Sequence, residues 1–341
     1  MTLLLQNSTL NLSYPLTMKY SKTLLTCMAL LLYQQVFCWG FYAHQVINHQ
    51  AVFSLPPSMM AFYKPNIDFL TIHAVDPDKR RYMVDAEGPR HFMDLNRYGS
   101  YPFDALPRNW GTAVEKYGED SLRKHGIVPW WIHIMLARLT NSFRQKDYPR
   151  ILRLSAELGH YIADAHVPLH THSNYNGQLT GQNGIHGFWE SRIPELLAES
   201  SFDYWTGKAV YIVSPSQFIW NTVLESSRAA DSVLLFEKIL TQQFGADQKY
   251  AYDQRNGITI RQYSSAFTIA YNNMLNGMVE RRMRQSILAV ASLWYTAWVN
   301  AGQPVLEAPG KIAFSAVDST AFEALDRDWQ KGKAVDRTCD N

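Results

Sequence analysis

Apolar positions recur with a helical period over most of the chain. The period is clearest from Pro129 to about Arg144 and from Tyr148 to about His166. Two longer amphipathic stretches run from Ser216 to about Gln243 and from Thr259 to about Asn300. The pattern therefore predicts an all-α fold, in a single multi-helix domain.

Three segments depart from the helical pattern. Residues 177–184 (GQLTGQNG) form a polar loop, and the run from Val210 to Val213 is the one short β-prone stretch. A glycine and a proline end the last helical stretch, and we expect residues 305–341 to be a loosely ordered tail. The predicted domain spans residues 39–304.

The first 38 residues have the features of a secretory signal peptide. Met18 is a second possible start, two lysines follow it, and Leu24–Leu32 is an apolar run of nine residues. Small residues precede Trp39 at the positions that a signal peptidase reads. We expect cleavage before Trp39 and a secreted or periplasmic protein without a transmembrane anchor, because a spanning helix needs about 20 apolar residues. A retained apolar anchor is the alternative.

Composition narrows the class of protein. The 341 residues are 47% hydrophobic and 18% charged, which excludes global disorder and a small disulfide scaffold. The formal net charge of +2 gives no polybasic field, so an anionic partner would have to bind at a local site, and no feature predicts a protein partner. Cleavage before Trp39 would leave Cys339 as the only cysteine, so no internal disulfide could form. A metal is the candidate staple.

The eleven histidines include a clustered set with metal-ligand spacing. His160 and Asp164 are four residues apart and so lie on one face of the second helix. His170 follows after the chain turns, and His186 and Glu190 repeat the four-residue spacing. Such nitrogen and oxygen ligands suit zinc, whose catalytic sites take three protein ligands and a water.

Each of these residues also has a purely structural interpretation. A single histidine and carboxylate four residues apart occur by chance in many helices. Two such pairs flanking His170 within 31 residues favour ligation. For the interleaved His166 and His172 we keep the structural interpretation, as we do for the isolated histidines His49, His73, His125 and His133.

Two sequence segments resemble a known superfamily. GHYIADAHVPLH at 159–170 and HGFWE at 186–190 are similar to the motifs of trinuclear zinc enzymes, which include bacterial phospholipase C and the single-strand-specific nucleases of fungi and plants. The resemblance spans roughly residues 39–195. It implies an all-α fold, three zinc ions and hydrolysis of phosphate esters.

The resemblance also nominates ligands outside these segments. The mature N-terminus of the family is a Trp that binds zinc through its own backbone groups, which corresponds to Trp39, and the nuclease branch has a His five residues later, here His44. RHFMD at 90–94 resembles the middle motif and nominates His91. The Asp ligand upstream of it is Asp78, with Asp76 in reserve.

These positions would form three ligand sets, one for each zinc ion. The sets that the resemblance implies are Asp78, His91, His160 and Asp164; the Trp39 backbone groups, His44 and a bridging Asp164; and His170, His186 and Glu190.

Zinc ions grouped in this way suit phosphodiester hydrolysis, because they activate water and neutralise the leaving oxygen. Asp78 would accept a proton from that water. The resemblance assigns a phosphate-binding role to Arg81, three residues later. The alternative for Arg81 is a surface position within the basic run at 79–81.

Three functions remain open from sequence. The short interval from His170 to His186 and the final Glu190 are closer to the phospholipase branch, whereas His44 is spaced as in the nucleases. A phospholipid substrate needs an apolar lip, and a single-stranded nucleic acid needs an aromatic face, for which Phe92 is the candidate. The third possibility is a secreted zinc-stabilised binding protein without turnover. Candidates for the lip are Phe41, Tyr42, Phe188 and Trp189.

Overall fold

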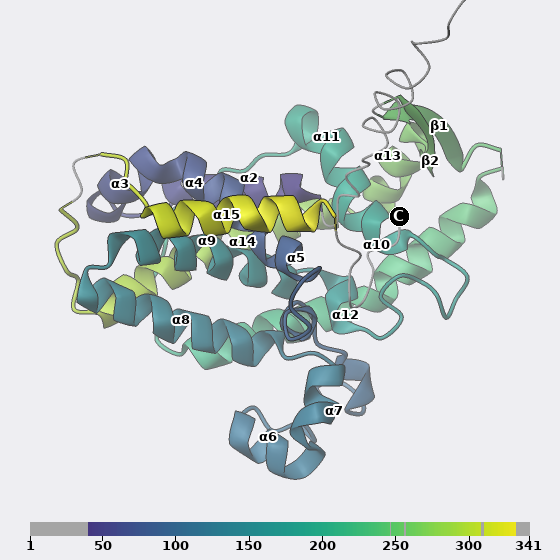
Figure 1. Ribbon diagram of the computed structural model, residues 1–341. Coiled ribbons are helices and arrows are strands. Elements are labelled where there is room, and N and C mark those ends of the chain that lie inside the picture. Colours follow the sequence, from purple (N-terminus) through teal and green to yellow (C-terminus); the bar gives the residue numbers. More distant parts are fainter. Residues whose placement is uncertain (1–39, 246, 256, 308–309, 332–341) are drawn as a thin grey trace, which may run out of the picture. The chain divides into compact units, whose positions relative to one another are not determined.

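The computed structural model describes residues 40–331, except for 246, 256 and 308–309 (Figure 1). The described residues are mostly helical, with one two-stranded sheet, which confirms the predicted all-α class. All of them fall within one compact unit. None of the described helices is both long enough and apolar enough to cross a bilayer.

The elements follow one another along the chain. The α-helices are α2 (Phe41–Phe53), α3 (Pro57–Tyr63), α4 (Ile67–Ile72), α5 (Asp76–Arg80), α6 (Trp110–Tyr117), α7 (Glu119–Lys124), α8 (Val128–Gln145), α9 (Tyr148–Ala165), α10 (Ile185–Gly187), α11 (Ile193–Ser201), α12 (Pro215–Gln243), α13 (Ser265–Met274), α14 (Met278–Asn300) and α15 (Ala316–Trp329). Shorter elements are the 3-10 turns η1 (Lys64–Asn66), η2 (His73–Val75), η3 (Gly88–Arg90), η4 (Leu95–Arg97) and η5 (Pro168–Thr171), the π turn η6 (Phe188–Arg192) and the strands β1 (Tyr250–Arg255) and β2 (Ile258–Tyr263).

Helices α8 and α9 match the two predicted helical stretches from Pro129 and from Tyr148, and they pack against each other. Lys146 ends α8 in the left-handed region at φ 53°, and the Asp147 side chain caps α9 by accepting from the Arg150 backbone N–H at 3.2 Å. α9 packs against α2, α4, α8 and α14, so almost every residue from Ile151 to Ala165 is buried. Polar side chains on this helix therefore lie inside the protein.

Helices α2 and α9 cross at close distance where Asn48 meets Gly159. The Asn48 side-chain amide on α2 donates to the backbone carbonyls of Ala156 at 3.0 Å and Leu70 at 3.2 Å. A Cβ atom at Gly159 would lie 2.0 Å from Asn48 Oδ1, so only glycine fits at this crossing. His44, one helical turn before Asn48, thereby stacks on the His160 ring with centroids 3.9 Å apart.

The β-hairpin corrects the predicted helix from Thr259 to Asn300. Residues 250–263 pair as antiparallel strands with Arg255 opposite Ile258, and helix resumes only in α13 and α14. Asn256-Gly257 between the strands is a strong two-residue hairpin signal that the helical period obscured. The β-prone run 210–213 contains no strand.

The predicted tail contains an ordered helix, α15, which packs against α5 (Figure 1). Ser315 caps it by accepting from the Asp318 backbone N–H at 3.1 Å. Lys79 Nζ lies 2.6 Å from Asp326 Oδ1, and the Trp329 ring packs on Phe41 with centroids 5.2 Å apart. The expectation of a loosely ordered tail is therefore wrong for residues 316–329.

Candidate metal centre

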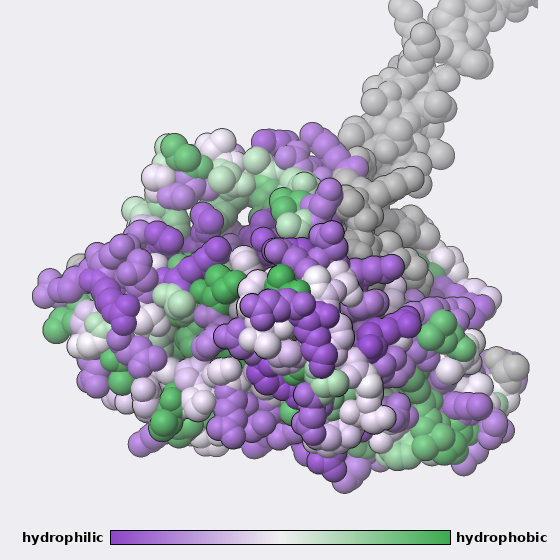
Figure 2. Space-filling view, turned by 90° about the horizontal axis from the view of Figure 1, so that it is seen from below, coloured by the Kyte–Doolittle hydropathy of each residue, from purple (hydrophilic) through white to green (hydrophobic). Residues whose placement is uncertain are grey.

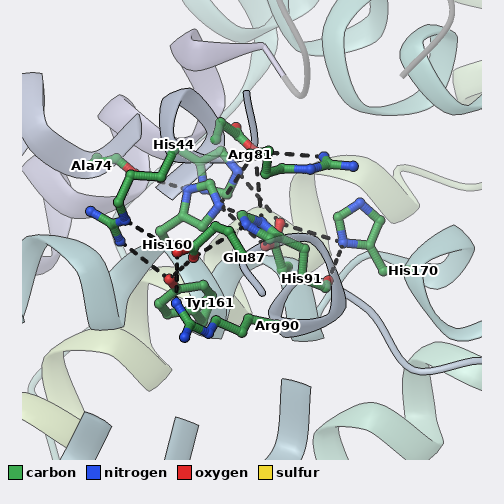
Figure 3. Close-up of polar contacts among 12 residues, drawn as sticks. His44, Ala74, Arg81, Glu87, Arg90, His91, His160, Tyr161 and His170 are labelled. Carbon is green, nitrogen blue, oxygen red and sulfur yellow. Dashed lines mark hydrogen bonds and ion pairs between the residues drawn. The ribbon is translucent and has the colours of Figure 1, made fainter. Parts of the chain in front are cut away.

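Side chains from α2, α5, α9, η5 and the α10–η6 segment meet in the interior, together with a loop histidine that follows η3. Figure 3 shows His44, His91, His160 and His170. All are buried, and His160 has no exposed surface. Among the described residues, three groups place their ligand atoms within 4.8 Å of one another and could each hold a metal ion. The groups are His44, His160 and Asp164; Asp78, His91 and His160; and His170, His186 and Glu190.

Asp164 lies at the middle of these groups. Its Oδ2 is 2.9 Å from His91 Nδ1 and 3.2 Å from His160 Nε2. Its Oδ1 is 3.5 Å from His44 Nε2 and 3.4 Å from His170 Nδ1. The two oxygens of one carboxylate therefore face different sets of imidazoles, an arrangement suited to a bridging ligand.

The hydrogen bond of His160 leaves a lone pair directed into the centre. His160 Nδ1 lies 2.9 Å from the Ala74 carbonyl oxygen, so it carries the proton and donates. In the neutral ring, Nε2 then directs its lone pair toward His91 Nδ1 at 3.0 Å and Asp78 Oδ1 at 3.6 Å. A backbone acceptor behind the ring is typical of metal-bound histidine.

The third group has the same arrangement. His170 Nδ1 donates to the His91 carbonyl oxygen at 2.9 Å, so its Nε2 lone pair faces Glu190 Oε2 at 3.4 Å. His186 Nε2 lies 3.0 Å from the same oxygen. Both Glu190 oxygens are buried and accept no hydrogen bond from the described residues. A buried carboxylate without a donor is unfavourable, so these atoms fit a bound metal ion.

Burial and neighbouring charges set the protonation of the centre. Burial, with a contribution from the His160 imidazole, lowers the pKa of His44 well below its usual value, which favours the neutral ring. Burial opposes ionisation of Asp164, but His160 and His170 outweigh it and hold its pKa well below the usual range. For His91, burial is outweighed by Asp164 and Glu87, which raise its pKa to about 9. Metal binding at His91 would therefore release a proton.

Asp78 has the opposite environment to Asp164. Burial, and after it the Asp164 charge, outweigh the nearby imidazoles and raise the pKa of Asp78. Arg81 Nη1 is 3.9 Å from Asp78 Oδ1, and Arg81 is buried at the edge of the centre rather than on the surface (Figure 3). The reserve residue Asp76 lies apart from the three groups, with its carboxylate 2.6 Å from His73 Nδ1 and 3.3 Å from Lys79 Nζ.

The interleaved histidines are not in the ligand groups. His166 Nδ1 donates to the Ile162 carbonyl oxygen at 2.7 Å, and burial together with Arg282 lowers the pKa of His166 to about 3. His172 Nδ1 accepts from the Asn174 backbone N–H at 2.9 Å. Trp39, the predicted N-terminal ligand, lies outside the described residues.

The aromatic residues proposed for substrate contact are mostly core residues. Phe92 is 5% exposed and packs closely against Gly126, so it offers little ring surface for base stacking. Phe41, Phe188 and Trp189 are buried as well. The interior of a helical domain needs large apolar side chains, and this need explains these positions without a substrate.

Sequence analysis did not identify Glu87, which is fully buried beside His91. Its spacing, four residues before His91, was the available signal, but the intervening Gly-Pro gave no reason to expect a helical pair.

Comparison with models of known protein families finds no match, and comparison with curated proteins finds none either. The function of the chain must therefore be inferred from the side chains of this centre and from the sequence motifs.

Proposed function

We propose that this chain is a secreted zinc-dependent phosphodiesterase that resembles phospholipase C in its chemistry. The observation that carries the proposal is the position of Asp164, whose two oxygens face His91 and His160 on one side and His44 and His170 on the other. Zinc is compatible with this set, because it binds imidazole nitrogen and carboxylate oxygen, and the motifs resemble those of zinc enzymes.

In this proposal the zinc ions, Asp78 and Arg81 have separate roles in hydrolysis. Zinc ions, when bound, would lower the pKa of a water molecule and neutralise the oxygens of the phosphodiester. Asp78, beside the ligand atoms of His91 and His160, accepts the proton of the attacking water. Arg81, held 3.9 Å from Asp78, binds a non-bridging phosphate oxygen.

Phospholipids are the first substrate class to test. The HxxxE spacing of His186 and Glu190 supports this class, as does the small net charge. On the face of the molecule in Figure 2, apolar residues form small groups among polar ones. The spacing and position of His44 favour the second candidate, a single-strand-specific nuclease.

The test begins with the zinc content of the exported full chain, measured by mass spectrometry. Hydrolysis of bis(4-nitrophenyl) phosphate is then followed before chelation, after chelation and after zinc is restored. We expect chelation to abolish activity and zinc to restore it. Arg81→Gln should keep the zinc and lose most of the activity, whereas Asp76→Asn should keep both.

Substrate class is decided by two parallel assays. Release of phosphocholine from phosphatidylcholine is compared with cleavage of heat-denatured DNA by the same zinc-loaded preparation. Cleavage of the DNA alone would assign the nuclease function. A chain that binds zinc but hydrolyses none of the three substrates would be a zinc-stabilised binding protein, and one that binds no zinc would refute the proposal.

A further inference from the structure

Glu87 is a buried carboxylate that three side chains hold in place. Arg90 Nη1 donates to its Oε2 at 2.7 Å, Arg80 Nε donates to the same oxygen at 3.2 Å, and the Tyr161 hydroxyl donates to its Oε1 (Figure 3). Glu87 has no exposed surface. Two guanidinium groups and one hydroxyl therefore fix the orientation of the carboxylate.

The remaining neighbour of Glu87 is the ring of His91. His91 Nε2 lies 3.7 Å from Glu87 Oε1, while Nδ1, on the other side of the ring, lies 2.9 Å from Asp164 and 3.0 Å from His160. The buried Nε2 has no hydrogen bond to any described residue. The His91 ring thus separates a fixed anion from the group of metal-ligand atoms.

We propose that Glu87 is a positioning residue for His91, which it orients so that Nδ1, and not Nε2, is the ligand atom. This inference rests on the metal centre of the proposed function. When Nδ1 binds a metal, the proton of the neutral ring is on Nε2, where it needs an acceptor in this dry interior. Glu87 Oε1, 3.7 Å from Nε2, is the carboxylate oxygen positioned to accept this proton. Carboxylates in this position fix the tautomer of a ligating histidine and raise its basicity.

The competing explanation is that Glu87 only fastens the loop 82–91 to α9. Glu157 offers a matched control, because its Oε1 lies 2.9 Å from Nη1 of the same Arg80 and it does not face His91. Glu87→Gln and Glu157→Gln each remove one charged partner of Arg80 while keeping the length of the side chain. A fastening role alone would affect the two variants through stability. A positioning role would affect metal binding in Glu87→Gln only.

The experiment measures zinc affinity of the full chain by competition with a chelator, with thermal unfolding of each variant in parallel. We expect Glu87→Gln to bind the zinc ion held by His91 about 10- to 100-fold less tightly than the wild type does. Glu157→Gln should bind zinc as the wild type does. In the cobalt-substituted proteins, the visible absorption bands should shift for Glu87→Gln and not for Glu157→Gln.

A second measurement uses the wild type alone and so does not depend on whether a variant folds. Ring ¹⁵N chemical shifts of His91 in the wild type should show, on addition of zinc, metal at Nδ1 and a proton at Nε2. Metal at Nε2, or equal zinc affinities of the two variants, would overturn the inference about Glu87 while leaving a zinc-loaded enzyme intact. A wild-type chain that takes up no zinc would overturn the proposed function and this inference together.

Discussion

Replacement of Asp164 is the most direct test of the metal centre. Asp164→Asn keeps the size of the side chain but removes the negative charge and turns one oxygen into an amide nitrogen that cannot bind a metal. The residue lies on α9, and its two oxygens face four imidazoles at 2.9 to 3.5 Å. Because each oxygen faces a different side of the centre, the variant should weaken two metal positions at once.

The size of the effect follows from the electrostatics. A unit charge pair 4 Å apart contributes about 4 kcal/mol at an effective dielectric constant of about 20. Counting only one unit of the metal charge, loss of the Asp164 carboxylate should weaken binding by about a thousandfold at each position that it contacts. The metal-free variant should still fold, because the carboxylate makes its close contacts within the centre and Asn can still accept one hydrogen bond there.

The assay is the number of zinc ions retained per chain after dialysis, with circular dichroism to verify folding. Asp76→Asn is the control, since Asp76 is equally buried and is also paired with a histidine, yet belongs to none of the ligand groups. We expect the control to retain the wild-type content and Asp164→Asn to lose two ions. An Asp164→Asn protein that keeps its full zinc content would refute the bridging arrangement.

Three further predictions concern stability. Chelation should lower the melting temperature, because a zinc site contributes about 4 kcal/mol when free zinc is at a thousandfold excess over its Kd. This corresponds to roughly 7 °C for a chain of about 300 residues, and thermal scans with and without EDTA measure it. Gly159→Ala should cost about 1 to 3 kcal/mol in urea unfolding, because the new Cβ would lie 2.0 Å from Asn48 Oδ1, and an unchanged midpoint would contradict the tight crossing. The pKa of His166 is lowered to about 3 by burial and by Arg282, so its contribution to stability is complete above pH ~6.5 and is lost as the pH falls toward 3. In EDTA, urea unfolding of the wild type should therefore lose about 2 kcal/mol more than His166→Gln between pH 7 and pH 5, and equal losses would assign the titration elsewhere.

The sequence was most informative where ligands are close along the chain. Helices α8 and α9 followed from helical periodicity, and the four-residue spacing of His160 and Asp164 required one helical face. Positions such as Asp78 and His91 could not be placed with this group from periodicity, because they reach it from other segments. Only the resemblance of their motifs nominated them.

Other features depend on contacts that no local pattern encodes. Glu87 has a partner in Tyr161, 74 residues away, and its role depends on which side of the His91 ring it occupies. Aromatic residues near ligands have the same sequence pattern whether they line a pocket or fill the core. The burial of Phe92 in the structure shows that it belongs to the core. The helix α15 was missed because its stabilising contacts, Lys79 among them, belong to a segment almost 250 residues earlier.

The distribution of ligands along the chain suggests how the metal centre and the fold depend on each other. The described residues include no cysteine, so no disulfide crosslinks them. The ligand groups instead join segments from His44 on α2 to Glu190 on η6, whereas α12, α13 and α14 contribute no ligand to them. These later helices pack behind the centre: Arg282 on α14 donates to the His166 carbonyl oxygen at 2.8 Å, and Trp294 donates to the Ser155 carbonyl oxygen at 3.0 Å. We therefore expect α9 to remain anchored whether or not a metal is bound. In contrast, metal loss leaves the carboxylates and imidazoles that join α5, η5 and η6 without the cation that compensates them, so we expect these segments to gain amide hydrogen exchange on chelation while α14 remains protected.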